Sequence, residues 1–115
     1  MNETVSIQDF KALEVYLRLL KRPTSYCVGN DLFYLKHWLD LTSENFASRL
    51  KKEYPRLTNK EMNLCCFQRM GYSIEEMSRM LQVKEDTIKR NMYRACTHLN
   101  ISNNREVFKA FVAAF

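Results

Sequence analysis

The segment VKEDTIKRNMYRA, residues 83–95, carries polar side chains suited to binding an anionic partner. At helical spacing, Arg90 and Tyr93 fall on one side, with Lys89 and Arg94 on its two flanks. Donors at the centre of such a face can reach base edges in the major groove of duplex DNA, and cations at its edges can meet phosphates. The alternative is an ordinary solvated face, which most amphipathic helices have.

The same stretch must bury its other side for the polar face to be held in place. On a helix predicted over 85–99, the core-facing arc of about 100° contains five residues, which are Ile88, Met92, Ala95, Cys96 and Leu99. A preceding helix over 74–81 should bury Ile74, Met77 and Leu81, with Ser78 between them on the same face. The link is only 82–84, and we expect Val83 to hold the turn against the core. Two helices joined by so short a turn form a helix-turn-helix.

Helix start and stop signals are unusually regular around this pair. Capping boxes are predicted at Thr58 with Glu61 and at Ser73 with Glu76. Gly71 and Asn100 suit the left-handed turns that end helices, and Asn103 with Glu106 should cap a last helix into KAFVAAF. These signals predict four helices from residue 57 onward.

The first half of the chain predicts three more helices, over 6–21, 31–41 and 43–54. Ser6, with Asp9 three residues on, is the predicted N-cap of the first. Its apolar stripe comprises Ile7, Phe10, Leu13, Leu17 and Leu20, while Val15, Tyr16 and Leu19 lie off the stripe. That is more apolar surface than one face can use. Either this helix is sandwiched inside the domain, or part of it forms a subunit interface.

Composition sets the class of protein. The chain has 115 residues, of which 46% are hydrophobic and 27% charged, with only two Gly and two Pro, so we expect an ordered, helical protein. Its net charge of +5 favours a polyanionic partner, but the excess is spread over both halves and does not by itself locate a nucleic-acid face.

The sequence gives little support for a metal site, a catalytic site or a phosphate-binding loop. The cysteines form no CxxC pair and lack histidines at zinc-ligand spacing, so we expect reduced thiols packed as small hydrophobes. His37 and His98 have no catalytic neighbours, and there is no glycine-rich phosphate loop. We therefore expect no enzyme, cofactor, metal or small-molecule ligand. With no signal peptide and no apolar run long enough for a membrane, we expect a soluble cytoplasmic protein.

Residues 57–112 resemble the LuxR/GerE-type helix-turn-helix DNA-binding domain. The matching motifs are LTNKE (57–61), GYS (71–73), EMS (76–78), LQV (81–83) and TIK (87–89). The family typically reads L-T-x-R-E, G-x-S-x-x-E-I-A, L-x-I-S and T-V-K-x-H at these spacings. The resemblance implies a four-helix DNA-binding domain whose third helix enters the major groove and whose fourth often supports dimerisation.

The resemblance also implies roles for single residues. Lys89, Arg90 and Tyr93 would meet bases or nearby phosphates, and Thr87 and Asn91 would lie close to the DNA backbone. Glu61 would be structural, holding the helices together. A dimer contact would be expected on the last helix, at Phe108, Phe111 and Val112.

The chain departs from the family pattern at five positions. Lys60 replaces the usual arginine, Asn63 the second glutamate and Asn91 the frequent histidine. Lys84 stands where a Ser or Thr would cap the recognition helix, and Asp86 puts an acid on the face that would meet phosphates. These changes leave open a helix-turn-helix that binds DNA weakly or has been turned to protein contacts.

The sequence as a whole predicts an all-α protein. A four-helix LuxR-type helix-turn-helix domain over 57–115 is preceded by about three N-terminal helices in 1–56, which brace or oligomerise it. We expect a sequence-specific transcriptional regulator that binds double-stranded DNA as a homodimer through the helix at 85–99. The predicted DNA-binding residues are Thr87, Lys89, Arg90, Asn91, Tyr93, Arg94 and Thr97.

Three alternatives stay open. The chain could be a protein-interaction adaptor with a degenerate helix-turn-helix, or a sigma-factor-like promoter-reading domain that contacts RNA polymerase. The segment RLKKEYPRLTNKE (49–61) also resembles the stretch leading into such domains in longer regulators with a separate sensor, so the chain could be the output half of a larger signalling protein.

Overall fold

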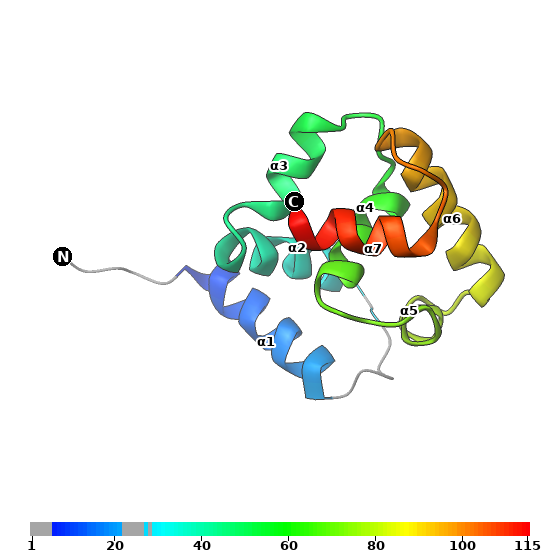
Figure 1. The fold of residues 1–115 in the computed structure, drawn as a ribbon. Coiled ribbons are helices and arrows are strands. Elements are labelled where there is room, and N and C mark those ends of the chain that lie inside the picture. The colour runs from blue at the N-terminus through cyan, green and yellow to red at the C-terminus, as the bar shows by residue number, and fades with distance from the viewer. Residues whose placement is uncertain (1–5, 22–26, 28) are drawn as a thin grey trace.

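The computed structural model describes residues 6–21, 27 and 29–115, with the side chains of 19–21 outside the described part. Within these residues the protein is all-α, as predicted, and contains no strand. Its helices are α1 (Ile7–Lys21), α2 (Asp31–Thr42), α3 (Phe46–Glu53), α4 (Asn59–Arg69), α5 (Ile74–Leu81), α6 (Glu85–His98) and α7 (Arg105–Ala114). α7 crosses the middle of the molecule, with α6 on one side of it and α1 on the other (Figure 1).

The predicted start and stop signals are largely confirmed. Both capping boxes, Thr58–Glu61 and Ser73–Glu76, form with their reciprocal hydrogen bonds. Gly71 and Asn100 take left-handed conformations, with φ of 87° and 60°. Ser6 also caps α1, since its hydroxyl accepts from the backbone N–H of Asp9 at 3.0 Å.

One predicted cap is wrong by a residue. The last helix is capped by Asn104 and not by Asn103. The Asn104 side chain accepts from the backbone N–H groups of Glu106 and Val107, at 2.8 and 3.2 Å. Because α7 begins at Arg105, the side chain in position to reach these N–H groups belongs to the residue just before it.

The third predicted helix begins later than expected. Glu44 and Asn45 have φ values of 52° and 60°, which a right-handed helix cannot include, so α3 starts at Phe46 instead of Ser43. The three apolar residues spaced by four still face the core. Phe46 and Leu50 are fully buried, and Tyr54 is packed against the core.

The turn between α5 and α6 corrects two predictions about the core. Met80 is fully buried where Leu81 was expected, and Val83 is 39% exposed instead of packing inward. The cause is Gln82, which ends α5 in a left-handed conformation with φ of 57°. The Ser78 hydroxyl then closes the turn by donating to the backbone carbonyl of Val83 at 2.5 Å.

α1 packs with one face on α2, so the interpretation of a helix sandwiched inside the domain is wrong. Ala12 and Val15 are buried, although Val15 lay off the predicted stripe. The stripe itself is turned outward, with Ile7 75%, Phe10 58% and Leu17 40% exposed. The side chains of Leu19 and Leu20, also named in the prediction, lie outside the described part.

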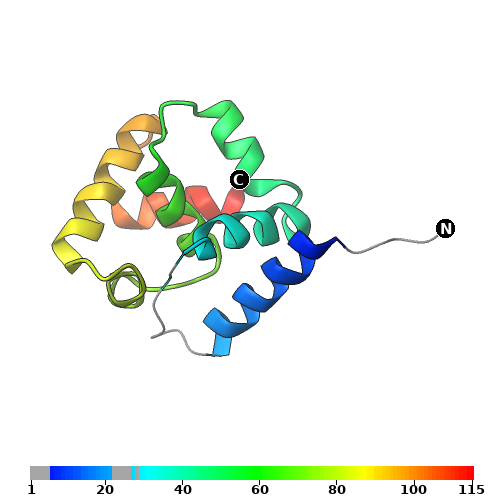
Figure 2. The same ribbon diagram turned by 180° about the vertical axis from the view of Figure 1, so that it is seen from behind.

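The N-terminal helices brace the last helix through an aromatic cluster. The rings of Phe46 and Phe115 lie 6.0 Å apart, and those of Tyr54 and Phe111 lie 5.7 Å apart. Arg49 adds a hydrogen bond from its guanidinium to the backbone carbonyl of Phe115 at 2.9 Å. Figures 1 and 2 show the end of α7 beside α2 and α3. Residues of both predicted regions thus share one hydrophobic core, while the division at residue 57 stays a prediction.

This packing corrects the expected dimer contact on α7. Phe108 and Val112 are 0% and 1% exposed, so they belong to the core and are not available to a second subunit. Phe111 is partly buried against Tyr54. The chain's own core, with Tyr54 on Phe111, covers the surface that the family resemblance assigned to a partner.

No helix among the described ranges is both long and apolar enough to span a membrane.

Replacing Phe46 with alanine should test this bracing. Phe46 is fully buried, so Phe46→Ala should lower the free energy of unfolding by about 3–5 kcal/mol, through lost burial and the cavity left behind. Phe33→Ala is the matched control because Phe33 is 53% exposed, and it should cost about 0.5 kcal/mol. Urea unfolding followed by circular dichroism measures both. Equal effects of the two variants would contradict the packing described.

Candidate nucleic-acid interface

α6 is fixed by one fully buried face. Ile88, Met92, Ala95 and Cys96 are at most 1% exposed, as the sequence predicted, and they pack toward α4, α5 and α7. Leu99, the residue that follows the helix, is buried with them. These four core positions, spread over about two and a half turns, prevent the helix from rotating about its axis. The opposite face is therefore presented to solvent in one orientation.

That opposite face carries cations without partners. Lys89, Arg90 and Arg94 are all exposed, and within the described part of the chain none of them forms an ion pair or a hydrogen bond through its side chain. Tyr93 lies among them and is 42% exposed. The structure thus brings together four of the predicted residues on one accessible surface, which we call the α6 polar face.

Several cations elsewhere are already used within the fold. Arg69 donates to the backbone carbonyl of Val112 at 2.8 Å, and Lys51 donates to that of Leu57 at 2.5 Å. Arg79 pairs with Glu75 at 2.8 Å. These side chains support structure, whereas those of the α6 polar face remain available for a ligand.

Thr97 sits on the same side of α6 but is partly engaged. Its hydroxyl donates to the backbone carbonyl of Tyr93, one turn earlier, at 3.3 Å. It also lies 3.5 Å from the side-chain oxygen of Asn103. Thr97 therefore has less freedom to reach a ligand than the other predicted residues.

Thr87 and Asn91 lie apart from the α6 polar face, on the flank that faces α4. Both are half-buried and line a hollow of about 180 Å³ together with Lys60 and Asn63. The amide oxygen of Asn63 is buried there without a hydrogen-bond partner. In the sequence alone, Lys60 and Asn63 stand out only as departures from the family pattern. They lie close to α6 because of the way α4 packs, and this packing cannot be predicted from the sequence.

The N-terminal end of α6 is acidic and lacks a side-chain cap. Lys84 occupies the N-cap position without a capping hydrogen bond, as predicted from the missing Ser or Thr. Glu85 and Asp86 are exposed in the first turn, where carboxylates stabilise the positive end of the helix dipole. Asp86 precedes Arg90 by one helical turn, so its charge opposes the attraction of an anion to the α6 polar face.

A buried carboxylate ties α6 to α4. Glu61 is only 3% exposed, and its Oε1 accepts from the backbone N–H of Thr58 at 3.1 Å. Nδ1 of His98 lies 2.6 Å from the same oxygen, so the imidazole donates to the carboxylate. These contacts join the start of α4 to the end of α6. They confirm the structural role that the resemblance implied for Glu61.

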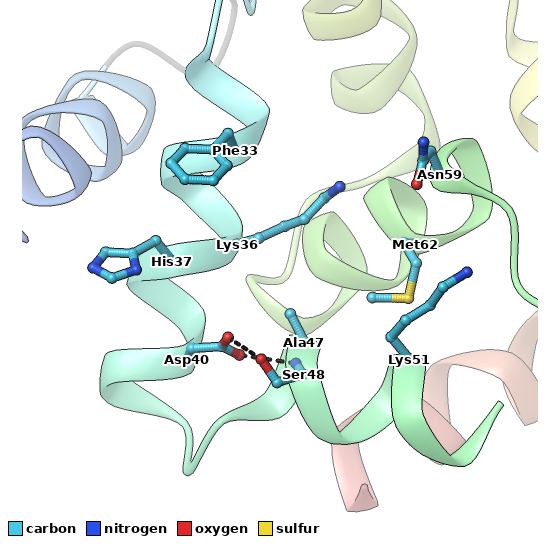
Figure 3. A pocket seen from close by; sticks show the side chains of 9 residues that line it. All are labelled: Phe33, Lys36, His37, Asp40, Ala47, Ser48, Lys51, Asn59 and Met62. Carbon is cyan, nitrogen blue, oxygen red and sulfur yellow. Dashed lines mark hydrogen bonds between the residues drawn. The ribbon is translucent and has the colours of Figure 1, made fainter. Parts of the chain in front are cut away.

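A second hollow, of about 290 Å³, lies between α2, α3 and α4 (Figure 3). Most polar side chains around it are engaged within the fold. Asp40 accepts from the hydroxyl of Ser48 at 2.6 Å, and His37 bonds to Asp9. Figure 3 shows Lys36 extending toward α4, without polar side chains converging on a common point. This arrangement does not define a ligand site.

The cysteines take no part in the interface. Cys65, Cys66 and Cys96 are buried free thiols, as predicted for small hydrophobes, and burial raises the pKa of Cys66 to about 12. Among the described residues, no three His, Cys, Asp or Glu side chains are grouped so that they could hold a metal ion.

Comparison of the chain with protein-family models, curated proteins and solved structures finds no match. The likeness to the LuxR/GerE type therefore rests on the motifs quoted above.

The Glu61 contacts can be tested against a matched site in the same protein. Glu61→Ala removes half of a capping box and leaves His98 and the Thr58 N–H without their acceptor, so it should destabilise the fold by about 2 kcal/mol. Glu76→Ala removes the equivalent half of the second capping box, where there is no histidine contact. It should cost about 0.5 kcal/mol. Chemical denaturation compares the two, and equal losses would show that the His98 contact contributes nothing.

Proposed function

We propose that this protein binds double-stranded DNA and regulates transcription, with α6 lying in the major groove. The observation that carries the proposal is the α6 polar face, where Lys89, Arg90 and Arg94 are exposed and unpaired within the described part of the chain. A helix held by a fully buried opposite face can enter a groove without losing its packing. Its fixed orientation also reduces the entropy lost on binding.

The surrounding helices support a helix-turn-helix. α5 and α6 are separated by three residues and pack on each other, and both belong to the same core as α4. In Figure 1, α5 is seen end-on while α6 runs across the view, so the two helices cross. A preceding helix that crosses a projecting second helix is the arrangement by which such motifs place the second helix in DNA.

The position of each side chain suggests its role. Arg90 lies at the centre of the α6 polar face, where its planar guanidinium could donate to the two acceptors of a guanine. Lys89 and Arg94 lie at the edges and would meet phosphates on either side of the groove. Lys60 lies near Thr87 and Asn91 on the α4 flank. These three side chains would add hydrogen-bond donors toward one DNA strand.

Titration of a labelled duplex pool at about 50 and 200 mM salt tests the proposal. Binding should weaken steeply with salt, because each phosphate contact contributes about −0.9 to the slope of log affinity against log salt. Lys89→Ala and Arg94→Ala should each reduce that slope by about 0.9 on every duplex. Arg90→Ala should cost about 1–3 kcal/mol on selected sequences and relax their base preference.

The control for this titration is Lys52→Ala. Lys52 is an exposed lysine on α3, distant in the chain from α6, and it carries the same charge. Its removal should leave the slope unchanged. If all three α6 variants bind like the parent, or if the parent fails to bind at both salt concentrations, the proposal is wrong.

The acids at the start of α6 give a second prediction. Asp86→Asn should increase DNA affinity at low salt several-fold, because it removes a negative charge one turn from Arg90. Glu106→Gln is the matched control. It removes an equal charge from the exposed first turn of α7, outside the α6 polar face. Both should lower thermal stability slightly, by about 0.3–1 kcal/mol. Equal changes in DNA affinity would show that the position of Asp86 on the helix is irrelevant.

A further inference from the structure

The outer face of α1 is an apolar surface that nothing in the described structure covers. Ile7, Phe10 and Leu17 are 75%, 58% and 40% exposed, and Leu13 between them is partly exposed. They follow one another at helical spacing along the side of α1 that points away from α2. We call these four residues the α1 stripe. Monomeric proteins seldom leave a row of large apolar side chains in water.

α1 is held firmly enough to serve as a binding surface. His37 on α2 bonds to Asp9 at 2.6 Å, and this hydrogen bond holds the pKa of the Asp9 carboxyl below its usual value. Farther along the helix Arg18 pairs with Asp31, and the Tyr16 ring stacks on Trp38 with centroids 4.7 Å apart. Contacts near both ends fix the rotation of α1 on α2. The α1 stripe is therefore presented in one orientation.

We infer that the α1 stripe binds the α1 stripe of a second copy of this chain, with the two helices antiparallel. The argument starts from two charges along one edge of the stripe. Lys11 and Glu14 are both exposed, have opposite sign, and form no ion pair within the described ranges. A surface that carries both signs can be complementary to itself under a two-fold axis.

One axis satisfies both the charges and the apolar residues. Placed between residues 12 and 13, a two-fold axis perpendicular to α1 brings Lys11 of each copy opposite Glu14 of the other. The same axis lies near the middle of the α1 stripe. It therefore sets Ile7 beside Leu17 of the second copy and Phe10 between Leu13 and Leu17 of that copy, so that the large side chains alternate instead of colliding. The axis that pairs the charges and the middle of the α1 stripe therefore nearly coincide. This agreement favours a second copy over an unrelated partner.

This location leaves the DNA-binding proposal intact and does not depend on it. α1 and α6 lie on opposite sides of the molecule in both views (Figures 1 and 2), so pairing through α1 leaves each α6 polar face accessible. The buried α7 residues Phe108 and Val112 are not available for this purpose. A helix of 15 residues is about 22 Å long, so the interface is small and we expect a dissociation constant of about 10–100 µM.

Sedimentation equilibrium of the full chain, loaded from about 5 to 500 µM, measures the dissociation constant of the dimer. Variants that exchange the charges of Lys11 and Glu14 test the inference. Lys11→Glu and Glu14→Lys should each weaken dimerisation by about tenfold, because each places like charges opposite one another at two symmetric positions. The double variant K11E/E14K should restore the parent affinity. Phe10→Glu should leave the chain monomeric throughout the range. Circular dichroism checks that each variant keeps its helices.

The control is Lys52→Glu on α3, which makes the same charge change outside the α1 stripe and should not alter the dissociation constant. A parent chain that stays monomeric would overturn the inference. So would a dimer that the single exchanges leave unchanged, or one that the double exchange does not restore. DNA titration of the Phe10→Glu variant on a single duplex site separates the two proposals. Unchanged binding would show that α6 works without the α1 contact.

Discussion

The whole arrangement of α4 and α6 depends on one buried carboxylate. A carboxyl group that is only 3% exposed, like that of Glu61, needs hydrogen-bond partners within the protein. Its partners come from two distant points of the chain, the backbone of Thr58 at the start of α4 and the imidazole of His98 at the end of α6. Separating these helix ends would leave a buried charge without partners. The contact therefore fixes the end of α6 that is far from the turn, while the left-handed Gln82 and the Ser78 hydroxyl fix the near end.

The N-terminal half completes this unit by covering the last helix. Phe46 and Tyr54 pack on Phe111 and Phe115, and the guanidinium groups of Arg49 and Arg69 donate to carbonyls at the end of α7. Carbonyls at the end of a helix need hydrogen-bond donors from elsewhere in the fold, and the two arginines supply them here. Two sides of the molecule consequently carry different kinds of exposed side chain. Cations that have no ion pair among the described residues lie on α6, and large exposed apolar side chains lie on α1 at the opposite side.

Local signals in the sequence predicted most of the fold because they act over three or four residues. The capping boxes at Thr58 and Ser73 and the left-handed positions at Gly71 and Asn100 all formed where expected. Two local predictions were misplaced, namely the cap at Asn103 and the start of α3. The other predictions that failed depend on long-range packing. Periodicity could not decide which side of α1 would face α2, because both sides are apolar. Nor could it show that Phe108 and Val112 would be buried where α7 packs on α4 and α6, or that Lys60 would lie beside Thr87. The α6 polar face was predictable because its buried complement, from Ile88 to Cys96, is continuous.

The most direct test of the central claim is an amide-resolved NMR titration of the protein with a short DNA duplex. If the α6 polar face binds DNA, the amides of Lys89, Arg90, Tyr93 and Arg94 should shift most. Smaller changes should follow at Lys60 and Thr87, and none along α1. Shifts confined to α1 and α2, or no shifts at saturating DNA, would contradict the account.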